Sequence, residues 1–158
     1  MDGVSQALAA IVDGDAPLSP GLAMGRAFLT TGVAFKIAAV PFHYWTPDAY
    51  QGSPTPVTGY LSVGPKVGAF ALIIRLFGEA LWPLADVWLP IVLVLSTLTM
   101  TLGNLVALTQ DNVKRMLAYS SIAHTGYMLV GLAAWAGDPE GRSDGLEALL
   151  FYGVAYAF

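Results

Sequence analysis

The sequence predicts an all-α membrane protein, a polytopic bundle of about five transmembrane helices with an incomplete last helix. Apolar residues make up 56% of the 158 residues and charged residues only 11%, and the mean hydropathy is +0.63. Soluble domains carry about 25% charged residues, so this chain has too few charges to face water on all sides. One stretch, Val87–Gln110, contains no charged residue, and a helix needs about 20 such residues to cross a bilayer.

The other elements follow in chain order from their apolar length and from the Pro, Gly and Asp residues between them. Residues 1–21 carry Asp2, Asp13 and Asp15 but no basic segment, which excludes a secretory signal and favours an external loop with a short helix at Val4–Val12. The last stretch is too short to cross a membrane. We expect a transmembrane region over 22–158, with spans at about 22–42, 57–77, 87–110, 114–136 and 146–158.

Charge predicts the orientation of these spans. Lys114 and Arg115 follow a short turn and are expected on the cytoplasmic side, where basic residues are enriched. Counting back and forward from this turn places the N-terminus, the Gly78–Asp86 loop and the Gly137–Gly145 loop outside. Acidic residues dominate all three external segments, which is consistent with this topology.

Two lysines stand inside apolar spans and are the first candidates for chemistry. Placing Lys36 or Lys66 at mid-membrane costs about 2.5–3.5 kcal/mol on insertion scales, and ionisable groups at that depth are functional by default. Burial disfavours the charged ammonium, so such a lysine can exchange its proton near neutral pH. A lysine paired with an acid elsewhere, or reaching to the membrane surface, is the structural alternative.

Prolines close to both lysines predict irregular backbone beside them. Pro41 and Pro65 cannot donate to the carbonyls of Ile37 and Leu61, because proline has no backbone N–H. Irregular backbone at membrane depth is tolerated where it is buried in protein or lines a wet cavity, and interrupted helices are common at transporter sites. We therefore expect a broken helix near Pro41 and a second interruption at Pro65.

Polar side chains recur on single faces of the third and fourth spans. A stripe of Thr97, Thr101 and Asn104 is typical of interhelical hydrogen bonding. On the next span, Ser120, His124 and Tyr127 share a face, with Ser121 three residues before His124. His124 is a candidate for proton relay because histidine titrates near neutrality, with a structural role as the alternative.

Several other site classes are excluded or disfavoured by the residues present. His43 lies beside Tyr44 and Trp45 at a predicted span end and is interpreted as structural. The chain has no cysteine, and its sequence shows no phosphate-binding loop, nucleophilic triad or metal-binding cluster. A formal net charge of −4 without a basic stripe argues against binding of nucleic acid.

Similarity to a known family covers most of 24–158. It is carried by Phe35–Phe70, FKIAAVPFHYWTPDAYQGSPTPVTGYLSVGPKVGAF, and by Gly103–Leu132, GNLVALTQDNVKRMLAYSSIAHTGYMLVGL. Both stretches resemble the antiporter-like membrane subunits of NADH:quinone oxidoreductase (complex I), whose helices form inverted repeats. The resemblance implies a fragment covering roughly the seventh to the eleventh of about fourteen helices.

The resemblance also implies roles for single residues. The lysine of the broken seventh helix falls on Lys36, that of the eighth helix falls on Lys66, and His124 falls on the polar tenth helix, where a relay role is possible. The fifth-helix acid and the twelfth-helix lysine of the family have no counterpart here, since Glu79 and Glu147 do not match that position. The chain is thus expected to need the rest of its subunit in order to pump protons.

The implied function is proton translocation in the membrane arm, coupled to electron transfer elsewhere in the enzyme complex. This chain should then bind no cofactor, whereas NADH, FMN, iron–sulfur clusters and quinone should bind partner subunits. Its expected partners are the lipid bilayer and other membrane-arm subunits, and its expected location is the bacterial plasma membrane. A subunit of a multi-subunit cation/proton antiporter or membrane-bound hydrogenase, and a non-transporting scaffold, are the alternatives.

Overall fold

A computed structural model describes residues 3, 6, 20–137 and 142–158 of the chain, and these residues form helices joined by short connections without β-strands. The all-α fold class is therefore confirmed for the described part of the chain. The predicted external loop and its short helix fall almost entirely outside the described residues. The helices are α2 (Pro20–Lys36), α3 (Trp45–Gly52), α4 (Thr55–Arg75), α5 (Ala85–Ala107), α6 (Val113–Gly137) and α7 (Arg142–Ala157).

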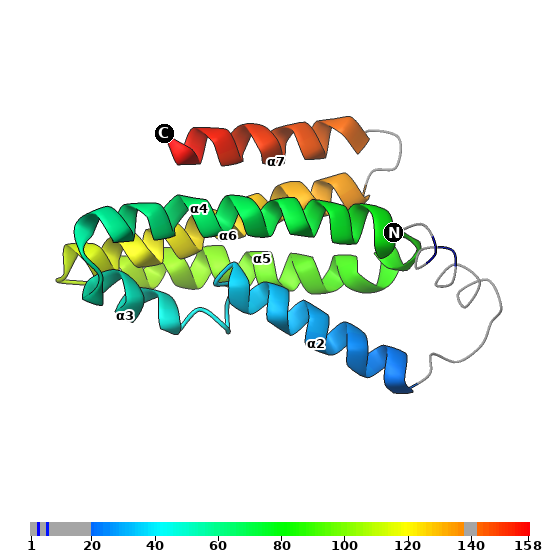
Figure 1. Ribbon diagram of the computed structural model, residues 1–158, viewed down its shortest axis with the longest axis horizontal. Helices are drawn as coiled ribbons and strands as arrows, with labels where there is room; N and C mark the ends of the chain where they lie inside the picture. Colours follow the sequence, from blue (N-terminus) through cyan, green and yellow to red (C-terminus); the bar gives the residue numbers. More distant parts are fainter. Residues whose placement is uncertain (1–2, 4–5, 7–19, 138–141) are drawn as a thin grey trace.

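Three long helices, α4, α5 and α6, run along the longest axis of the molecule, and α7 also packs along α6 (Figure 1). Helix α3 lies at the end where α5 turns into α6, while α2 diverges from the bundle at an angle (Figure 1). Helix α6 is the central element: it packs against α3, α4, α5 and α7. It also carries more buried residues than any other helix described.

Two stretches of the described chain are helical, long and apolar enough to cross a membrane. They are Thr55–Ala80 and Trp82–Ala107, with mean hydropathies of 1.5 and 1.9. The first includes a π-helical turn, η1 (Leu76–Ala80), and the second begins with a 3₁₀ turn, η2 (Trp82–Leu84). Helix α6 has 25 residues and, at 1.5 Å per residue, is about 37 Å long, but its polar residues lower its hydropathy.

Close backbone contact holds α5 against α6. A Cβ atom added to Gly126 would lie 2.6 Å from the backbone nitrogen of Met100, and one added to Gly103 would lie 2.8 Å from that of Ala123. Ser96 adds a hydrogen bond from its hydroxyl to the carbonyl of Gly126, at 3.1 Å. Small residues that let backbones approach are a common means of helix association in membranes.

The expected break near Pro41 is present, but the helix stops earlier than predicted. Helix α2 ends at Lys36, and Ala38 takes a left-handed conformation with φ of 58°. The chain then passes through turns, with a cis peptide bond before Pro41, to Trp45. Lys36 is consequently the last residue of its helix and not a residue in its interior.

The second expected interruption, at Pro65, is wrong. Helix α4 runs without a break from Thr55 to Arg75 with Pro65 in its interior. A missing N–H removes one hydrogen bond of the helix, and here the flanking turns preserve the helical path. Lys66 is thus held on a continuous helix, whereas Lys36 stands at a helix end.

Candidate functional site

The amine of Lys66 lies inside the bundle, where α4 faces α6 and α7. Lys66 is only 5% exposed. Its Nζ donates hydrogen bonds to the hydroxyl of Ser121 on α6, at 2.6 Å, and to the backbone carbonyl of the same residue. The ring of Tyr156 on α7 lies 5.4 Å below the amine, a distance at which an aromatic face attracts a cation. Among the described residues, no carboxylate contacts this amine.

Ser121 joins Lys66 to two tyrosines. Its hydroxyl is 3.2 Å from the hydroxyl of Tyr50 on α3 and 2.6 Å from that of Tyr156 on α7. Tyr50 is only 2% exposed, so this contact is shielded from the surroundings. A serine hydroxyl has one donor and two acceptor positions. It can therefore accept from Lys66 while it donates to one tyrosine.

His124 lies one helical turn from Ser121 on α6 and is surrounded by tyrosines. Its Nδ1 is hydrogen-bonded to the hydroxyl of Tyr152, at 2.6 Å. Its ring lies 4.9 Å from that of Tyr156 and 5.7 Å from that of Tyr127. Tyr156 therefore contacts the Lys66 amine, the Ser121 hydroxyl and the His124 ring. This brings two of the predicted site residues, Lys66 and His124, into one polar cluster.

A cavity adjoins this cluster on the side of α3 and α4. Its volume is about 430 Å³. Ser121, His124 and Tyr156 line one part of it, and Thr58 and Lys114 line another. The amine of Lys114 donates to the carbonyl of Ser53 at 2.7 Å. The cavity thus extends from the polar cluster towards the turn that the charge pattern assigns to the cytoplasm.

Side chains from other segments bond the peptide groups that are left without helical partners at the break after Lys36. The indole Nε1 of Trp45 donates to the carbonyl of Phe35, at 3.1 Å. The backbone N–H of Val40 donates to Oγ1 of Thr99 on α5, at 3.0 Å. Thr125 on α6 donates to the carbonyl of Ile37, at 3.1 Å. Buried peptide groups need such partners, which is why an interrupted helix is stable here.

The side chain of Lys36 is exposed on the surface of the described bundle and takes no part in the Lys66 cluster. The backbone beside it does reach that cluster, because the Thr125 hydroxyl lies within hydrogen-bond distance of both the carbonyl of Ile37 and that of Ser121. The structure accordingly brings Lys66 and His124 together and connects Lys36 to them through the main chain.

Several residues of the cluster were missed at the sequence level. Tyr50, Tyr152, Tyr156 and Thr125 are not among the predicted site residues, although Tyr152 and Tyr156 are spaced four residues apart on one helix face. That spacing was a signal that could have been used. The contacts of Tyr50 and Thr125 join elements more than 70 residues apart, and no local pattern indicates them.

The residues of the predicted Thr/Asn stripe on α5 differ in whether they form a hydrogen bond to another helix. Asn104 forms the expected interhelical bond, from Nδ2 to the hydroxyl of Tyr127 at 2.7 Å. Thr97 instead donates to the carbonyl of Leu93 on its own helix. The ring of His43 packs edge-on against Tyr119, with 6.2 Å between centroids.

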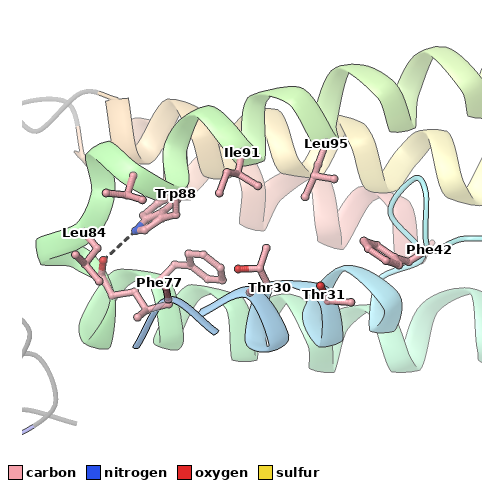
Figure 2. Close-up of a pocket in the computed structure, with 12 residues that line it drawn as sticks. Thr30, Thr31, Phe42, Phe77, Leu84, Trp88, Ile91 and Leu95 are labelled. Atoms are coloured by element: carbon pink, nitrogen blue, oxygen red, sulfur yellow. Dashed lines mark hydrogen bonds between the residues drawn. The ribbon is translucent and has the colours of Figure 1, made fainter. Parts of the chain in front are cut away.

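A separate cavity of about 350 Å³ lies between α2 and α5 and is apolar in character. Figure 2 shows Phe42, Phe77 and Leu95 around it, with Thr30 and Thr31 of α2 as its polar side chains. It contains none of the predicted site residues.

As for metal ions, the described residues contain no group of three His, Cys, Asp or Glu side chains that could hold one.

Fold and site together define a class of protein: a helical membrane protein with a lysine amine enclosed by hydroxyl groups between its helices. A family model described as "NADH:quinone oxidoreductase/Mrp antiporter, TM" matches residues 4–158. The chain belongs to this family of antiporter-like transmembrane proteins.

Curated relatives agree with the sequence resemblance, which is closest to subunit N through the motifs VPFHYWTPD and SVGPK. Proteins named NADH-quinone oxidoreductase subunit N are 55% identical in Dehalococcoides mccartyi over 87% of this chain, and 47% identical in Mycobacterium tuberculosis over 100% of it. The chain spans 29% and 28% of these two relatives.

A solved structure shows the same fold. A chain of respiratory complex I from Thermus thermophilus with bound aureothin is 38% identical, with a TM-score of 0.61. The match covers 98% of this chain and 36% of that one. The membrane character and the antiporter-like fold of this chain are thereby established.

Proposed function

We propose that this chain forms part of the proton-translocating membrane arm of an NADH:quinone oxidoreductase in a bacterial plasma membrane. In this proposal Lys66, Lys36 and His124 hold and pass protons, while NADH, FMN, iron–sulfur clusters and quinone bind other subunits. Other membrane-arm subunits and lipid surround the bundle. The names of the relatives support the assignment to this enzyme, and the chemistry rests on the enclosed amine of Lys66.

The observation that carries the proposal is that the partners of Lys66 are a hydroxyl, a carbonyl and an aromatic ring, all without charge. An ion pair with a carboxylate would fix the proton on the amine, because opposite charges favour the charged state. Neutral partners hold the ammonium only through hydrogen bonds. The environment therefore supports a lysine whose proton can leave and return.

The hydroxyl of Ser121 offers the proton a path in two directions. It accepts from Lys66 and can donate to Tyr156, next to His124, or to Tyr50 on α3, and all three of these side chains line the cavity beside the cluster. The charge of Lys66 would then change when a neighbouring charge changes, since nearby charges shift proton affinity. This supports coupling along the membrane arm by electrostatic interaction.

Substitutions in the full-length subunit test this proposal. Lys66→Met and Lys36→Ala should each lower proton pumping in membrane vesicles, measured with a pH-sensitive dye, more strongly than they lower the amount of assembled complex. Arg75→Met is the control, because Arg75 is exposed and pairs with Glu79 at 3.5 Å. Normal pumping by assembled complexes with Lys66→Met would contradict the role of that lysine.

The family description also includes Mrp antiporters, which makes a subunit of a cation/proton antiporter the second candidate. The soluble proteins that purify with the full-length subunit separate the two. An NADH-oxidising assembly supports the oxidoreductase, and a membrane complex without one supports the antiporter.

A further inference from the structure

Thr125 lies between the two lysine regions and is fully buried. Its Oγ1 is 3.1 Å from the carbonyl oxygen of Ile37 and 3.2 Å from that of Ser121. A threonine hydroxyl has a single proton to donate. At nearly equal distances the two carbonyls therefore compete for the same donor.

The carbonyl of Ser121 is also an acceptor for the amine of Lys66. A hydrogen bond from a charged donor is about twice as strong as one between neutral groups. A protonated Lys66 consequently weakens the attraction of this carbonyl for the Thr125 proton. The charge on Lys66 therefore influences which of the two carbonyls accepts the proton of the Thr125 hydroxyl.

The carbonyl of Ile37 belongs to the break that follows Lys36. It lies where α2 has ended and the next residue, Ala38, is left-handed. Thr125 supplies it with a donor from another helix, inside the protein, where Ile37 is only 2% exposed. Losing this bond would leave a buried carbonyl unpaired, which destabilises the conformation that exposes it.

We infer that Thr125 is a positioning residue that couples the charge on Lys66 to the geometry of the helix break after Lys36. When Lys66 donates to the carbonyl of Ser121, the Thr125 proton is directed to the carbonyl of Ile37 and holds the break. When Lys66 has lost its proton, the neutral amine is a weaker donor to the carbonyl of Ser121, so Thr125 turns towards Ser121 and the break loosens. This inference rests on the proposed function, because it requires Lys66 to change its charge.

Hydrogen–deuterium exchange of the backbone amides in residues 38–40, measured on the assembled full-length protein, tests the coupling. Thr125→Val removes the hydroxyl at nearly constant volume and should raise exchange in this segment by up to about tenfold, the loss of one hydrogen bond. Thr125→Ser keeps the hydroxyl and should restore slow exchange. Thr97→Val is the matched control, because Thr97 bonds only its own helix.

A double-mutant cycle separates coupling from a purely structural role. Lys66→Met should raise exchange at residues 38–40 when Thr125 is present and should have little further effect in the Thr125→Val background. Equal effects of Lys66→Met in both backgrounds, or no effect of Thr125→Val, would overturn the inference. If Thr125→Val fails to assemble, Thr125→Ala completes the same cycle.

Pumping by the same variants distinguishes this inference from the proposed function. Loss of pumping in Lys66→Met with additive exchange effects leaves the proposed function standing and removes the role of Thr125. Normal pumping in Lys66→Met removes the proposed role of Lys66, and with it the inference.

Discussion

The two lysine regions of this chain are built in different ways. Lys66 is buried and its amine contacts Ser121 on α6 and Tyr156 on α7, whereas Lys36 stands exposed at the end of α2. Its position at a helix C-terminus is favourable for a cation, because the helix dipole is negative there. Side-chain hydroxyls define the first region, and backbone geometry defines the second.

The two regions also differ in how far this chain by itself supplies the contacts of the lysine. The Lys66 cluster has its donors and acceptors within this chain. Lys36, by contrast, is exposed, and the chain spans only 29% and 28% of the two curated relatives named above. We therefore expect substitutions around Lys66 to alter the stability of the helix bundle. Substitutions around Lys36 should alter the conformation of the break after α2.

The largest effect is expected for Ser121→Ala. This change removes an acceptor from Lys66 and the shared partner of Tyr50 and Tyr156, leaving buried polar groups unpaired. It should lower the free energy of unfolding by about 3 kcal/mol, measured by thermal unfolding of the purified subunit, and reduce proton pumping. Ser120→Ala is the neighbouring control and should stay within about 0.5 kcal/mol.

Next in size is Gly126→Ala, which tests the helix pair that carries the Lys66 cluster. The added methyl would lie 2.6 Å from the backbone nitrogen of Met100, so α5 and α6 must separate. We expect a loss of about 2 kcal/mol from overpacking, seen as a lower unfolding temperature. Gly68→Ala is the control: its methyl meets nothing within 4 Å, and it should not destabilise the helix.

A smaller loss is expected for Thr99→Val, which probes the break from the side of α5. The substitution leaves the N–H of Val40 without its partner, at a cost of about 1 kcal/mol. Faster amide exchange at residues 38–40 and a small drop in unfolding temperature are the measurements. Unchanged exchange would show that the break does not depend on this bond. Thr101→Val, on an exposed position of the same helix, is the control.

The sequence predicted the broken helix near Lys36 but not the contacts of Lys66. The all-α class and the presence of a broken helix followed from apolar length and from Pro41, because both are local properties of the chain. The family resemblance implied roles for Lys66 and His124 separately, on the eighth and tenth helices, and did not predict that both lie against Tyr156. The polar stripe on α6 indicated Ser121 as a neighbour of His124, but not as a partner of Lys66.

What the sequence did not predict depends on tertiary contacts. The contact of Lys66 with Ser121 joins positions 55 residues apart. The uninterrupted course of α4 through Pro65 shows that surrounding helical residues can outweigh one missing donor. Helix α2 ends at Lys36, ahead of Pro41, and Ala38 is left-handed. An alanine in the sequence does not predict this conformation.

The last effect, and the only stabilising one, is expected at Ala38. A left-handed conformation costs a non-glycine residue about 1–2 kcal/mol, so Ala38→Gly should raise the unfolding temperature by the equivalent of about 1 kcal/mol. Ala39→Gly is the matched control: Ala39 is fully buried without a positive φ, and glycine there should destabilise by about 0.5–1 kcal/mol. Opposite signs for the two changes would identify backbone strain as a property of the break, whereas equal destabilisation would show that the loss of a buried methyl outweighs it. Because the strain lies two residues from Lys36, its relief in Ala38→Gly should also slow amide exchange at residues 38–40 while leaving the Lys66 cluster unchanged.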